Sequence, residues 1–505
     1  MTLAIIYTRA NSGISAPLVT IEAHISRGMP GLCMVGLPET EVKESKHRVR
    51  SALLNSFFEF PSRRITINMA PADLPKEGGR FDLPIALGIL AASGQIPREK
   101  LHEYEFIGEL ALSGELRAVK GVLPIVLGAQ QAGRKLIVPP ENAEEAALLQ
   151  SAQVFSARHL LEVCSYLKGE RSLKKCERST QSLEPEITLD LFDVQGQLFA
   201  KRALEVAAAG QHSLLFIGPP GTGKTMLAQR LPGILPELTD QQALEIAAIT
   251  SVSLNGFDPH QWKKLPFRNP HHSISSVALV GGSRPPRPGE ISLAHHGILF
   301  LDELPEFGRH VLESLREPLE SGCVKISRAS YQMILPAQFQ LIAAMNPCPC
   351  GYVGSQKDRC RCTYEQVQRY FAKLSGPLLD RIDMQVEVPS LPPDVLAQAA
   401  VDNRDKSVVV RARVQEARRF QLNRQGKCNA QLHGNELTEV CQLDTESQKL
   451  LLTAMEKFNL SARTYHRILK VARTIADLAQ IEMITKKQIG EALTYRCIDR
   501  QKSAS

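Results

Sequence analysis

The segment that most constrains this chain is a glycine-rich loop, Gly218–Thr225, which lies between two runs of different character. The apolar run Ser213–Ile217 before it predicts a buried strand, and the run Met226–Leu231 after it predicts a helix. Three glycines let backbone N–H groups curve around an anion, and the helix N-terminus adds partial positive charge at the same point. A chance glycine turn is the alternative, but the full loop pattern between a strand and a helix indicates a phosphate-binding loop.

The loop predicts a nucleotide site that takes ATP and Mg²⁺. Lys224 is expected to reach the β- and γ-phosphates, and the Thr225 hydroxyl is expected to bind Mg²⁺. The residues predicted to contact the nucleotide are Gly218, Pro219, Pro220, Gly221, Thr222, Gly223, Lys224, Thr225 and Met226.

Two further apolar runs end in polar residues that suit the same site. The run Gly297–Leu301 ends in two acids, as the acidic partner of such a loop should on a neighbouring strand. Asp302 is expected to hold Mg²⁺ and Glu303 to orient and activate the attacking water, unless both are plain surface acids. The run Phe339–Met345 ends at Asn346, which is expected to contact the water or the γ-phosphate, unless it only forms a turn before the next proline.

The chain is long enough, at 505 residues, for about three domains. Residues 1–165 read as mixed α/β, with a helix expected over Asp82–Ala92, and residues 166–185 read as a polar linker. Residues 186–390 alternate strands and helices as a doubly wound parallel sheet does, and residues 391–505 are helical. The predicted fold class is α/β with a helical C-terminal domain.

Composition adds weaker constraints on location and partners. The net charge of +7 permits a polyanionic partner without demanding one. The apolar run Leu83–Ala92 is shorter than the ~18 residues of a membrane helix, and the first eight residues do not resemble a secretion signal. We therefore expect no membrane association and a cytoplasmic location.

Eleven cysteines indicate a reducing compartment and no disulfide scaffold. Four of them crowd into one short segment, namely Cys348, Cys350, Cys360 and Cys362. Tetrahedral Zn²⁺ coordination by four thiolates is predicted if this segment folds back on itself, although the Cys-x-Cys spacing is tighter than usual. Two short disulfides or four free thiols are the alternatives.

Several segments, taken as a set, resemble one family. The set comprises the Gly289–Gly297 stretch before the acids, the Asn346–Gly351 stretch, the Leu379–Asp383 turn and the Phe267–His272 segment. It is similar to the magnesium-chelatase-like AAA+ ATPases and, within them, to the ComM/YifB family, over essentially the whole chain. The resemblance implies a hexameric ring that moves on single-stranded and branched DNA and drives branch migration in natural transformation.

The resemblance also implies roles for two arginines. AAA+ proteins insert an arginine finger into a neighbour's site, and Arg381 matches that position. A lid arginine reaches the γ-phosphate in the family, which implies Arg463 here, with Arg467 one turn on as the competing choice. A structural Asp–Arg pair at Arg381 and a solvated helix face at Arg463 are the alternatives.

The related MCM helicases carry a β-hairpin just before the strand that leads to the sensor residue. In this chain that strand is the run Phe339–Met345 before Asn346, which we call the sensor strand, and the segment Val324–Leu335 fits the place of the hairpin. Lys325 and Arg328 are therefore predicted to contact DNA phosphates in a salt-dependent and sequence-independent way. An ordinary surface hairpin is the alternative.

The first domain resembles the Lon protease domain, an S5-type α/β fold, through Ala70–Asp82 and Gly108–Arg117. That protease uses a Ser–Lys dyad. Here Arg80 stands at the expected serine position and Leu123 lies near the expected lysine position, so proteolysis is not expected. Ring assembly, DNA guidance and partner docking stay open as roles for this domain.

Two other clusters were weighed for a binding role. The histidine pairs 271–272 and 295–296 suggest a metal, but adjacent histidines on a strand point to opposite faces, so structural or pore-loop roles are favoured. Residues 401–430 hold eight Lys/Arg against three Asp/Glu, for which a solvated helix is the first reading and DNA or linker contact the second. The clustered arginines are Arg411, Arg413, Arg418 and Arg419.

Three functions compete at this point. The first is a DNA-translocating hexameric helicase, the second a metal-chelatase motor subunit, and the third a chaperone-like remodeller of proteins. The N-terminal domain argues against the second, because the chelatase motor subunit is expected to begin near its own phosphate loop.

Overall fold

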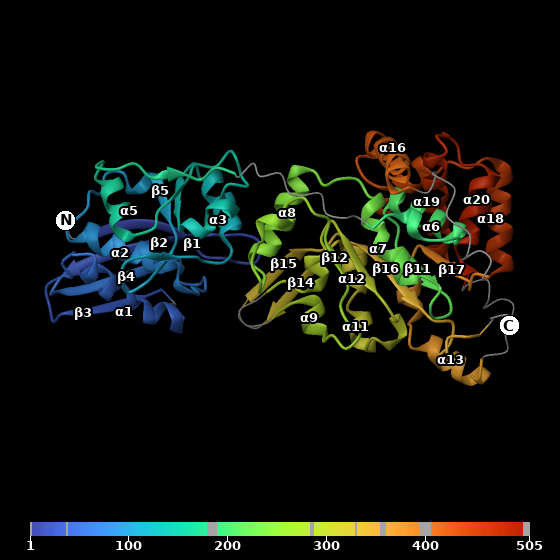
Figure 1. Ribbon diagram of the computed structural model, residues 1–505, viewed down its shortest axis with the longest axis horizontal. Coiled ribbons are helices and arrows are strands. Elements are labelled where there is room, and N and C mark those ends of the chain that lie inside the picture. The colour runs from blue at the N-terminus through green and yellow to red at the C-terminus, as the bar shows by residue number, and fades with distance from the viewer. Residues whose placement is uncertain are drawn as a thin grey trace.

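The computed structural model describes residues 3–36, 39–178, 189–282, 287–328, 331–353, 360–392 and 406–497, without the side chains at 40, 327–328 and 331–332. Figure 1 shows the blue N-terminal part at one end, the green and yellow central sheet next to it, and the orange and red helices at the other end. The fold is mixed α/β with a helical C-terminus, as predicted.

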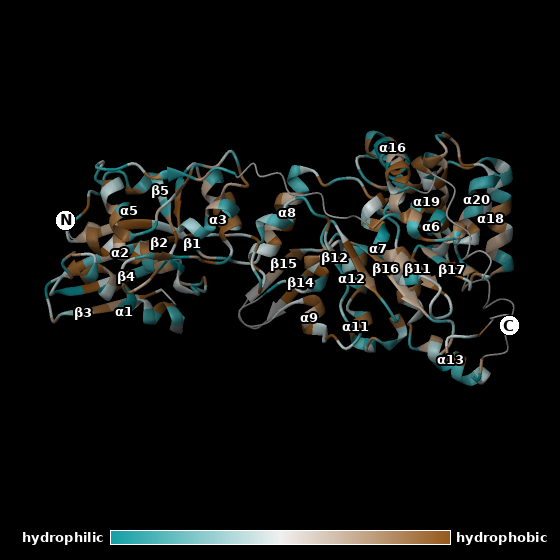
Figure 2. Ribbon diagram, viewed as in Figure 1, coloured by the Kyte–Doolittle hydropathy of each residue, from teal (hydrophilic) through white to brown (hydrophobic). Residues whose placement is uncertain are grey.

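The N-terminal part is built on an eight-stranded mixed sheet with the order β10-β9-β8-β5-β1-β2-β4-β3. The helix α2 is entirely buried against β1 and β2, and the hydropathy colouring of Figure 2 shows it as one of the brown segments of this part. Its bounds match the predicted helix. The strands are β1 Leu3–Arg9, β2 Leu18–Ser26, β3 Gly31–Val35, β4 Arg64–Ala70, β5 Tyr104–Phe106, β8 Lys135–Val138, β9 Val154–Ser156 and β10 Lys174–Lys175, beside the pair β6 Glu109–Leu110 and β7 Leu116–Arg117. The helices are α1 Thr40–Asn55, α2 Asp82–Ala92, α3 Val122–Gln131, α4 Ala143–Ala146 and α5 Leu160–Leu167.

The strand β10 lies inside the segment expected to be a linker, 166–185. It pairs with β9 in antiparallel register, Lys174 with Ser156 and Lys175 with Phe155, so the N-terminal sheet extends at least to this point. The polar side chains of β10 misled the composition argument, because an edge strand with both faces exposed needs no apolar residues.

The central part is a five-stranded sheet in the order β12-β13-β16-β11-β17, in which every neighbouring pair is parallel. The strand β16 lies between the glycine-loop strand β11 and the acidic strand β13, so the prediction that these two are neighbours is wrong by one strand. The strands are β11 Leu214–Ile217, β12 Phe267–Arg268, β13 Ile298–Leu301, β16 Gln340–Met345 and β17 Met384–Glu387. The helices are α6 Leu198–Gly210, α7 Lys224–Ile234, α8 Asp240–Ser251, α9 Ser276–Val280, α10 Glu290–Leu293, α11 Arg309–Glu313, α12 Arg316–Ser321, α13 Tyr364–Ala372 and α14 Gly376–Leu379.

The predicted hairpin is present as β14 Cys323–Arg328 and β15 Tyr331–Pro336, which pair in antiparallel register. One side of the hairpin packs on the N-terminal part: a Cβ added at Gly13 would lie 2.8 Å from the Met333 sulfur. A second contact joins α3 to α8 through an apolar cluster that contains Leu123 and Trp262. Leu123, which stands near the expected protease lysine, is therefore part of the packing between the two parts.

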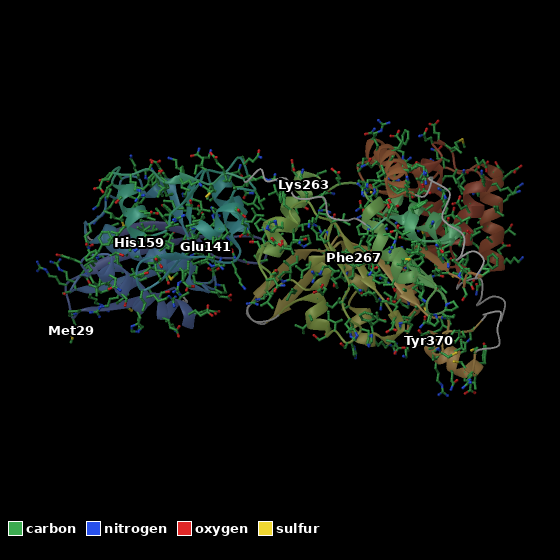
Figure 3. The ribbon with its side chains drawn as sticks, viewed as in Figure 1. Met29, Glu141, His159, Lys263, Phe267 and Tyr370 are labelled. Atoms are coloured by element: carbon green, nitrogen blue, oxygen red, sulfur yellow. The ribbon has the colours of Figure 1, made fainter. Side chains whose placement is uncertain are left out.

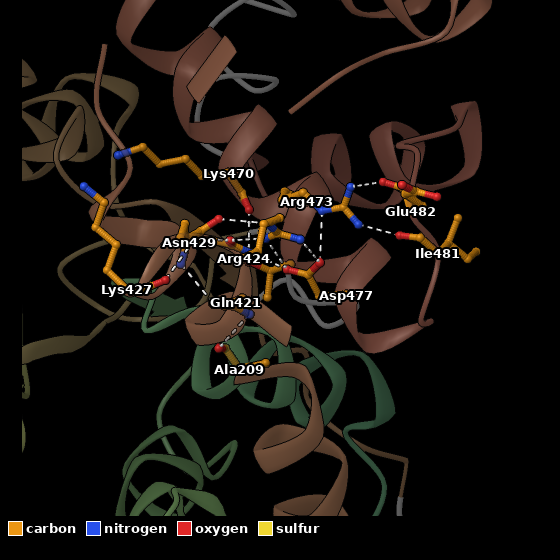
Figure 4. Close-up of polar contacts among 12 residues, drawn as sticks. Ala209, Gln421, Arg424, Lys427, Asn429, Lys470, Arg473, Asp477, Ile481 and Glu482 are labelled. Atoms are coloured by element: carbon orange, nitrogen blue, oxygen red, sulfur yellow. Dashed lines mark hydrogen bonds and ion pairs between the residues drawn. The ribbon is translucent and has the colours of Figure 1, made fainter. Parts of the chain in front are cut away.

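The C-terminal part is helical and packs on α6 and α7. Figure 4 shows its main polar network, in which the buried Asp477 carboxylate accepts hydrogen bonds from Arg424, Arg473 and Asn429. In the same network, Gln421 Nε2 donates to the Ala209 carbonyl at the end of α6. The helices are α16 Ser407–Gln425, α17 Asn435–Val440, α18 Thr445–Lys457, α19 Ala462–Leu478 and α20 Lys486–Thr494. No helix within the described residues combines the length and apolar character that crossing a bilayer requires.

Two arginines of α16, Arg411 and Arg418, face the fold, so the solvated-helix prediction is wrong for two of the four members of this cluster. Arg411 donates to the Gly233 carbonyl in the last turn of α7, and Arg418 donates to the Ala208 carbonyl near the end of α6. Arg413 pairs with Glu205 at 2.5 Å. Cations at helix C-termini satisfy carbonyl groups that the helix leaves unpaired, which is the physical reason for this arrangement. Arg413 and Arg419 are both exposed, and Arg419 pairs with Glu416.

Candidate nucleotide-binding site

The glycine loop follows β11 directly and leads into α7, as predicted. Two of its glycines, Gly221 and Gly223, have positive φ angles of +77° and +90°, which disfavour any side chain. Gly218 is required for space, because a Cβ there would lie 2.1 Å from the Val388 carbonyl oxygen at the end of β17. The loop is therefore shaped by backbone conformation and by close packing on the neighbouring strand.

The Lys224 ammonium group lies in the centre of the loop. Its Nζ donates to the carbonyls of Gly218 and Pro219, both at 2.8 Å, and to Asn346 Oδ1 at 3.2 Å. Burial lowers the pKa of Lys224, while the charges of Asp302 and Glu303 act to raise it. The structure therefore places a cation where the glycine loop, the sensor strand and the acidic strand meet.

The Thr225 hydroxyl donates a hydrogen bond of 2.7 Å to Asp302 Oδ2. Hydroxyl and carboxylate oxygens are hard ligands, the kind that Mg²⁺ prefers. Two such oxygens from separate elements, side by side at the carboxyl edge of a parallel sheet, fit the ion that the sequence predicts there.

Glu303 stands beside Asp302 in an unusual backbone conformation, with φ at +53°. Its N–H donates to Asp302 Oδ1 at 2.9 Å, and its carboxylate, which is more than half exposed, lies 3.4 Å from Nδ1 of His272. A non-glycine residue in the left-handed region often marks a functional position. The outward carboxylate is available to a ligand in the site.

Two residues near the site were missed by the sequence analysis. His272 follows β12, whose end in Phe267–Arg268 lies beside β13, and strand order alone brings it to Glu303. Gln197, with φ at +51°, donates from Nε2 to the Thr222 carbonyl at 3.2 Å and to the Pro389 carbonyl at 2.8 Å. The signal for His272 was its place after a strand; a glutamine before a helix gave no usable signal.

Arg381 lies at the opposite side of the sheet, where the strands have their amino ends, which we call the amino edge. Its main-chain carbonyl accepts from Ser213 Oγ, just before β11 begins, so a strand length of about 13 Å separates this point from the glycine loop. The side chain is 8% exposed. It donates to the Pro377 carbonyl at 2.8 Å and pairs with Glu320 at 2.6 Å. The structure does not bring Arg381 to the phosphate loop of its own chain.

Arg467, the alternative to Arg463 as the lid arginine, also lies at this amino edge. It pairs with Asp383, whose carboxylate also accepts from the N–H of Ser213. Burial acts to raise the pKa of Asp383, but the charge of Arg467 and the hydrogen bond with His212 lower it well below its usual range. Arg463 is exposed and, within the described residues, has no ion pair. Arg467 is therefore held at the amino edge and not at the loop.

The four clustered cysteines meet in space. Their sulfur atoms all lie within 4.8 Å of one another, and none of the eleven cysteines, all of which are described, forms a disulfide. Burial acts to raise the pKa of Cys350, but hydrogen bonds from the backbone N–H groups of Tyr352 and Arg361 lower it to about 6. The two disulfides considered as an alternative are absent.

The histidine pairs do not point to opposite faces, because neither pair lies on a strand. The ring centroids are 4.1 Å apart in His271–His272 and 3.8 Å apart in His295–His296. The second pair contacts Glu245 through both Nε2 atoms. Burial lowers the pKa of His295 to about 4, and its Nδ1 accepts from the Gln338 N–H, so Nε2 carries the proton. His295 therefore offers no lone pair to a metal, so a structural role remains favoured for this residue, though for a different reason than expected.

Comparison with known families covers nearly the whole chain. A family model described as magnesium chelatase, subunit ChlI, matches residues 190–396. Models described as subunit ChlI of Mg-chelatase and as the subunit ChlI C-terminal part match residues 21–142 and 404–496. The sequence analysis argued against a chelatase motor subunit because such a subunit was expected to lack this N-terminal domain. The match at 21–142 removes that argument.

Comparison with known proteins gives full-length relatives. The chain is 53% identical to competence protein ComM of Haemophilus influenzae over 505 residues, covering 99% of this chain and 98% of that protein. It is 51% identical to YifB of Escherichia coli over 500 residues, with 99% and 98% covered. Similarity to the magnesium-chelatase 67 kDa subunit of Heliobacterium mobile is weaker, 26% over 207 residues, covering 34% of this chain and 30% of that protein.

Proposed function

The chain belongs to the ComM/YifB family of magnesium-chelatase-related proteins, and from this premise we propose that it is an ATP-hydrolysing AAA+ motor that acts on DNA. The observation that carries the proposal is the meeting of Lys224, Thr225 and Asp302 with Asn346 at one edge of a parallel sheet. In this proposal the motor is a helicase or translocase that promotes branch migration during natural transformation, in the cytoplasm.

Each residue of the site has a role that its position supports. Backbone N–H groups of the loop and the Lys224 ammonium bind the triphosphate, and the Asn346 amide lies beside that ammonium. Mg²⁺, held by Thr225 and Asp302, supplies charge neutralisation to the phosphates. Glu303 orients the attacking water and takes its proton, for which its outward carboxylate is suited.

The position of Arg381 supports a ring, a homo-oligomer that we take to be a hexamer. An arginine about one strand length from its own phosphate loop can stabilise transition-state charge only in a neighbouring subunit's site. Arg381 would then exchange its Glu320 partner for the phosphate when the ring assembles. The same edge carries Arg467, and Arg463 lies one helical turn away, so a lid arginine would also act between subunits.

The proposed DNA contact is the hairpin of β14 and β15. Lys325 is exposed on β14, 4.0 Å from a carboxylate oxygen of Glu317, and Arg328 ends the same strand. The exposed cation and the excess positive charge of the chain support a polyanionic partner over a protein partner.

The second candidate is a chelatase-like motor that remodels a protein. It is supported by the three family models and by the match to the 67 kDa subunit. Coverage favours the first candidate, because this chain spans 98% of ComM and only 30% of that subunit.

The test is a strand-displacement and branch-migration assay on forked and three-stranded DNA, with and without ATP, together with ATPase rates with and without DNA. Lys325→Ala with Arg328→Ala should abolish DNA stimulation and reduce branch migration by about tenfold or more, while basal ATPase activity stays. A matched control is Lys174→Ala with Lys175→Ala, which removes two exposed charges from β10. ATPase activity that ignores DNA in the unmodified protein would favour the remodelling candidate.

A further inference from the structure

The cysteine cluster has the geometry of a site for one ion. The Cys348 and Cys350 sulfurs are 3.3 Å apart, Cys348 and Cys360 are 3.8 Å apart, and Cys350 and Cys360 are 3.6 Å apart. A tetrahedral ion with Zn–S bonds of about 2.3 Å holds its sulfurs about 3.8 Å apart. A disulfide would require about 2.05 Å. A cluster of two or four iron atoms divides the four cysteine sulfurs among different irons and so spreads the set farther apart than a single ion does.

The backbone around the cluster is also arranged for thiolates. Gly351 turns the chain with φ at +84°, and its N–H donates to the Cys348 carbonyl at 2.9 Å. The Val353 N–H then points at the Cys348 sulfur at 3.4 Å. This turn lets Cys348 and Cys350, only two residues apart, face the same point, which removes the objection that their spacing is too tight.

We propose that Cys348, Cys350, Cys360 and Cys362 bind one structural Zn²⁺, which clamps the segment after the sensor strand β16 onto the glycine loop and fixes the start of α13. The metal site itself stands on the sulfur geometry alone. Its second part, an effect on nucleotide binding, rests on the proposed ATPase function.

The clamp touches the glycine loop directly. A Cβ added at Gly351 would lie 2.7 Å from Pro220 Cδ in the loop and 3.7 Å from Asn346 Cγ. The Gly351 turn therefore packs on the loop and on the sensor side chain at the same time. Because Cys348 is fully buried and follows Asn346 by two residues, an ion on its sulfur limits the movement of both.

The other side of the clamp begins α13. Cys362 precedes Thr363, which caps this helix by a capping box with Gln366. The helix is tied to the segment after the acidic strand: Tyr370 is buried in the apolar core, and Lys373 pairs with Glu306 at 3.2 Å. Figure 3 shows Tyr370 beneath the central sheet, on α13. The ion would thus link the sensor strand to the helix that leads to α14 and Arg381.

The first experiment measures metal in the full-length protein, purified under reducing conditions and analysed by mass spectrometry of its metals. We expect about one zinc ion per chain, and loss of it in Cys362→Ser and in Cys348→Ser with Cys360→Ser. Cys33→Ser, an exposed cysteine outside the cluster, is the matched control and should keep the zinc. Iron in place of zinc, or zinc retained by the double variant, would overturn the proposal, and so would unmodified protein with almost no metal.

A cysteine variant could lose its metal simply because it fails to fold. Substitution of Co²⁺ into the unmodified protein tests the coordination without any change of sequence. The unmodified protein, stripped with a chelator and given Co²⁺, should show the intense thiolate charge-transfer bands and the visible bands of a tetrahedral sulfur site. Bands of an octahedral oxygen site would contradict four-sulfur coordination.

The second experiment tests the contact with the glycine loop through Gly351→Ala, which keeps all four thiols. We expect this variant to retain its zinc but to raise the KM for ATP by about tenfold, because its Cβ would displace Pro220. Chelator-treated unmodified protein should show the same rise, and added Zn²⁺ should reverse it. A normal KM in both would refute the clamp while leaving the metal site, whereas absence of any ATPase activity in the zinc-loaded protein would refute the proposed function and not the site.

Discussion

The polar groups at the two ends of the strands of the five-stranded sheet differ in whether they are free to bind a ligand. At the carboxyl edge, Lys224 is bonded mainly to main-chain carbonyls of its own loop, and Glu303 turns a carboxylate outward. At the amino edge, Arg381 and Arg467 are each paired with a carboxylate of the same chain. The carboxyl edge can therefore bind a charged ligand, while the arginines of the amino edge are already neutralised by carboxylates of the same chain.

This difference shows how each chain could contribute one half of a site at each of two interfaces with neighbouring copies. The phosphate-binding groups and the candidate finger are about a strand length apart, so no side chain can bridge them. A nucleotide between two copies of the chain would meet both edges. The comparison predicts that the carboxyl edge responds to substitution within a subunit and the amino edge across a subunit interface.

The largest expected effect is that of Arg381→Ala. Rings should assemble and bind ATP, but kcat should fall by about 10³-fold, because the transition state loses a cation. Mixing this variant with Lys224→Ala subunits should restore part of the activity, since some interfaces then combine an intact loop with an intact arginine. Steady-state ATPase rates across mixing ratios provide the measurement.

A matched mixture sharpens this result. Glu303→Gln and Lys224→Ala both damage the carboxyl edge, so no interface in their mixed rings has an intact site, and no rescue is expected. Equal rescue in both mixtures would remove the distinction between the edges.

Glu303→Gln alone should slow hydrolysis by about 10²-fold, because the amide cannot take a proton from water. Nucleotide binding should change little, since the substitution preserves shape and Glu303 is largely exposed. Binding of a fluorescent ATP analogue, compared with single-turnover hydrolysis, separates the two steps. Normal turnover would reject the assignment of Glu303.

Asp383→Asn tests whether the amino edge is structural. Breaking a buried ion pair should cost about 3 kcal/mol of the free energy of unfolding at pH 7. The pKa of Asp383 is lowered in the fold, so its contribution is complete above the unfolded pKa of about 3.9 and is lost as pH falls below that value. The difference in thermal stability between the two proteins should therefore shrink between pH 5 and more acidic conditions of about pH 3.

The neighbouring Asp380→Asn, on a residue that is only half-buried, is the control and should leave stability nearly unchanged. A stability difference for Asp383→Asn that stays constant down to the acid limb would mean that the pKa of Asp383 is not lowered in the fold.

The smallest expected effect is that of Arg411→Ala. Its guanidinium caps the Gly233 carbonyl of α7, so stability should fall by about 1 kcal/mol, measured by thermal unfolding. Arg419→Ala, which breaks an exposed pair with Glu416, should change stability by less than about 0.5 kcal/mol. DNA affinity should be unchanged in Arg411→Ala; a clear loss would return α16 to the candidate DNA surface.

Local patterns predicted the elements of the carboxyl edge well. The glycine loop, the acids after β13 and Asn346 after β16 were each predicted from an apolar run that ends at a glycine or a polar residue. Such a run is a local property, since a buried parallel strand must be apolar along its whole length. The hairpin was predicted from the family resemblance, and α2 from its own sequence pattern.

Three of the misses share one cause. The position of β16 between β11 and β13, the contact of His272 with Glu303 and the pairing of β10 with β9 all depend on strand order. Strand order is a pairing between distant segments, and hydrophobic periodicity carries no information about it.

By itself, therefore, the sequence determined which chemical groups this protein offers to a nucleotide, because the glycine loop and the strand-end acids are defined within a few residues. Only the tertiary structure decided where those groups stand relative to the arginines and the cysteines. Parallel strands must place all their carboxyl ends on one edge, and the order in which they pair decides which side chains meet there.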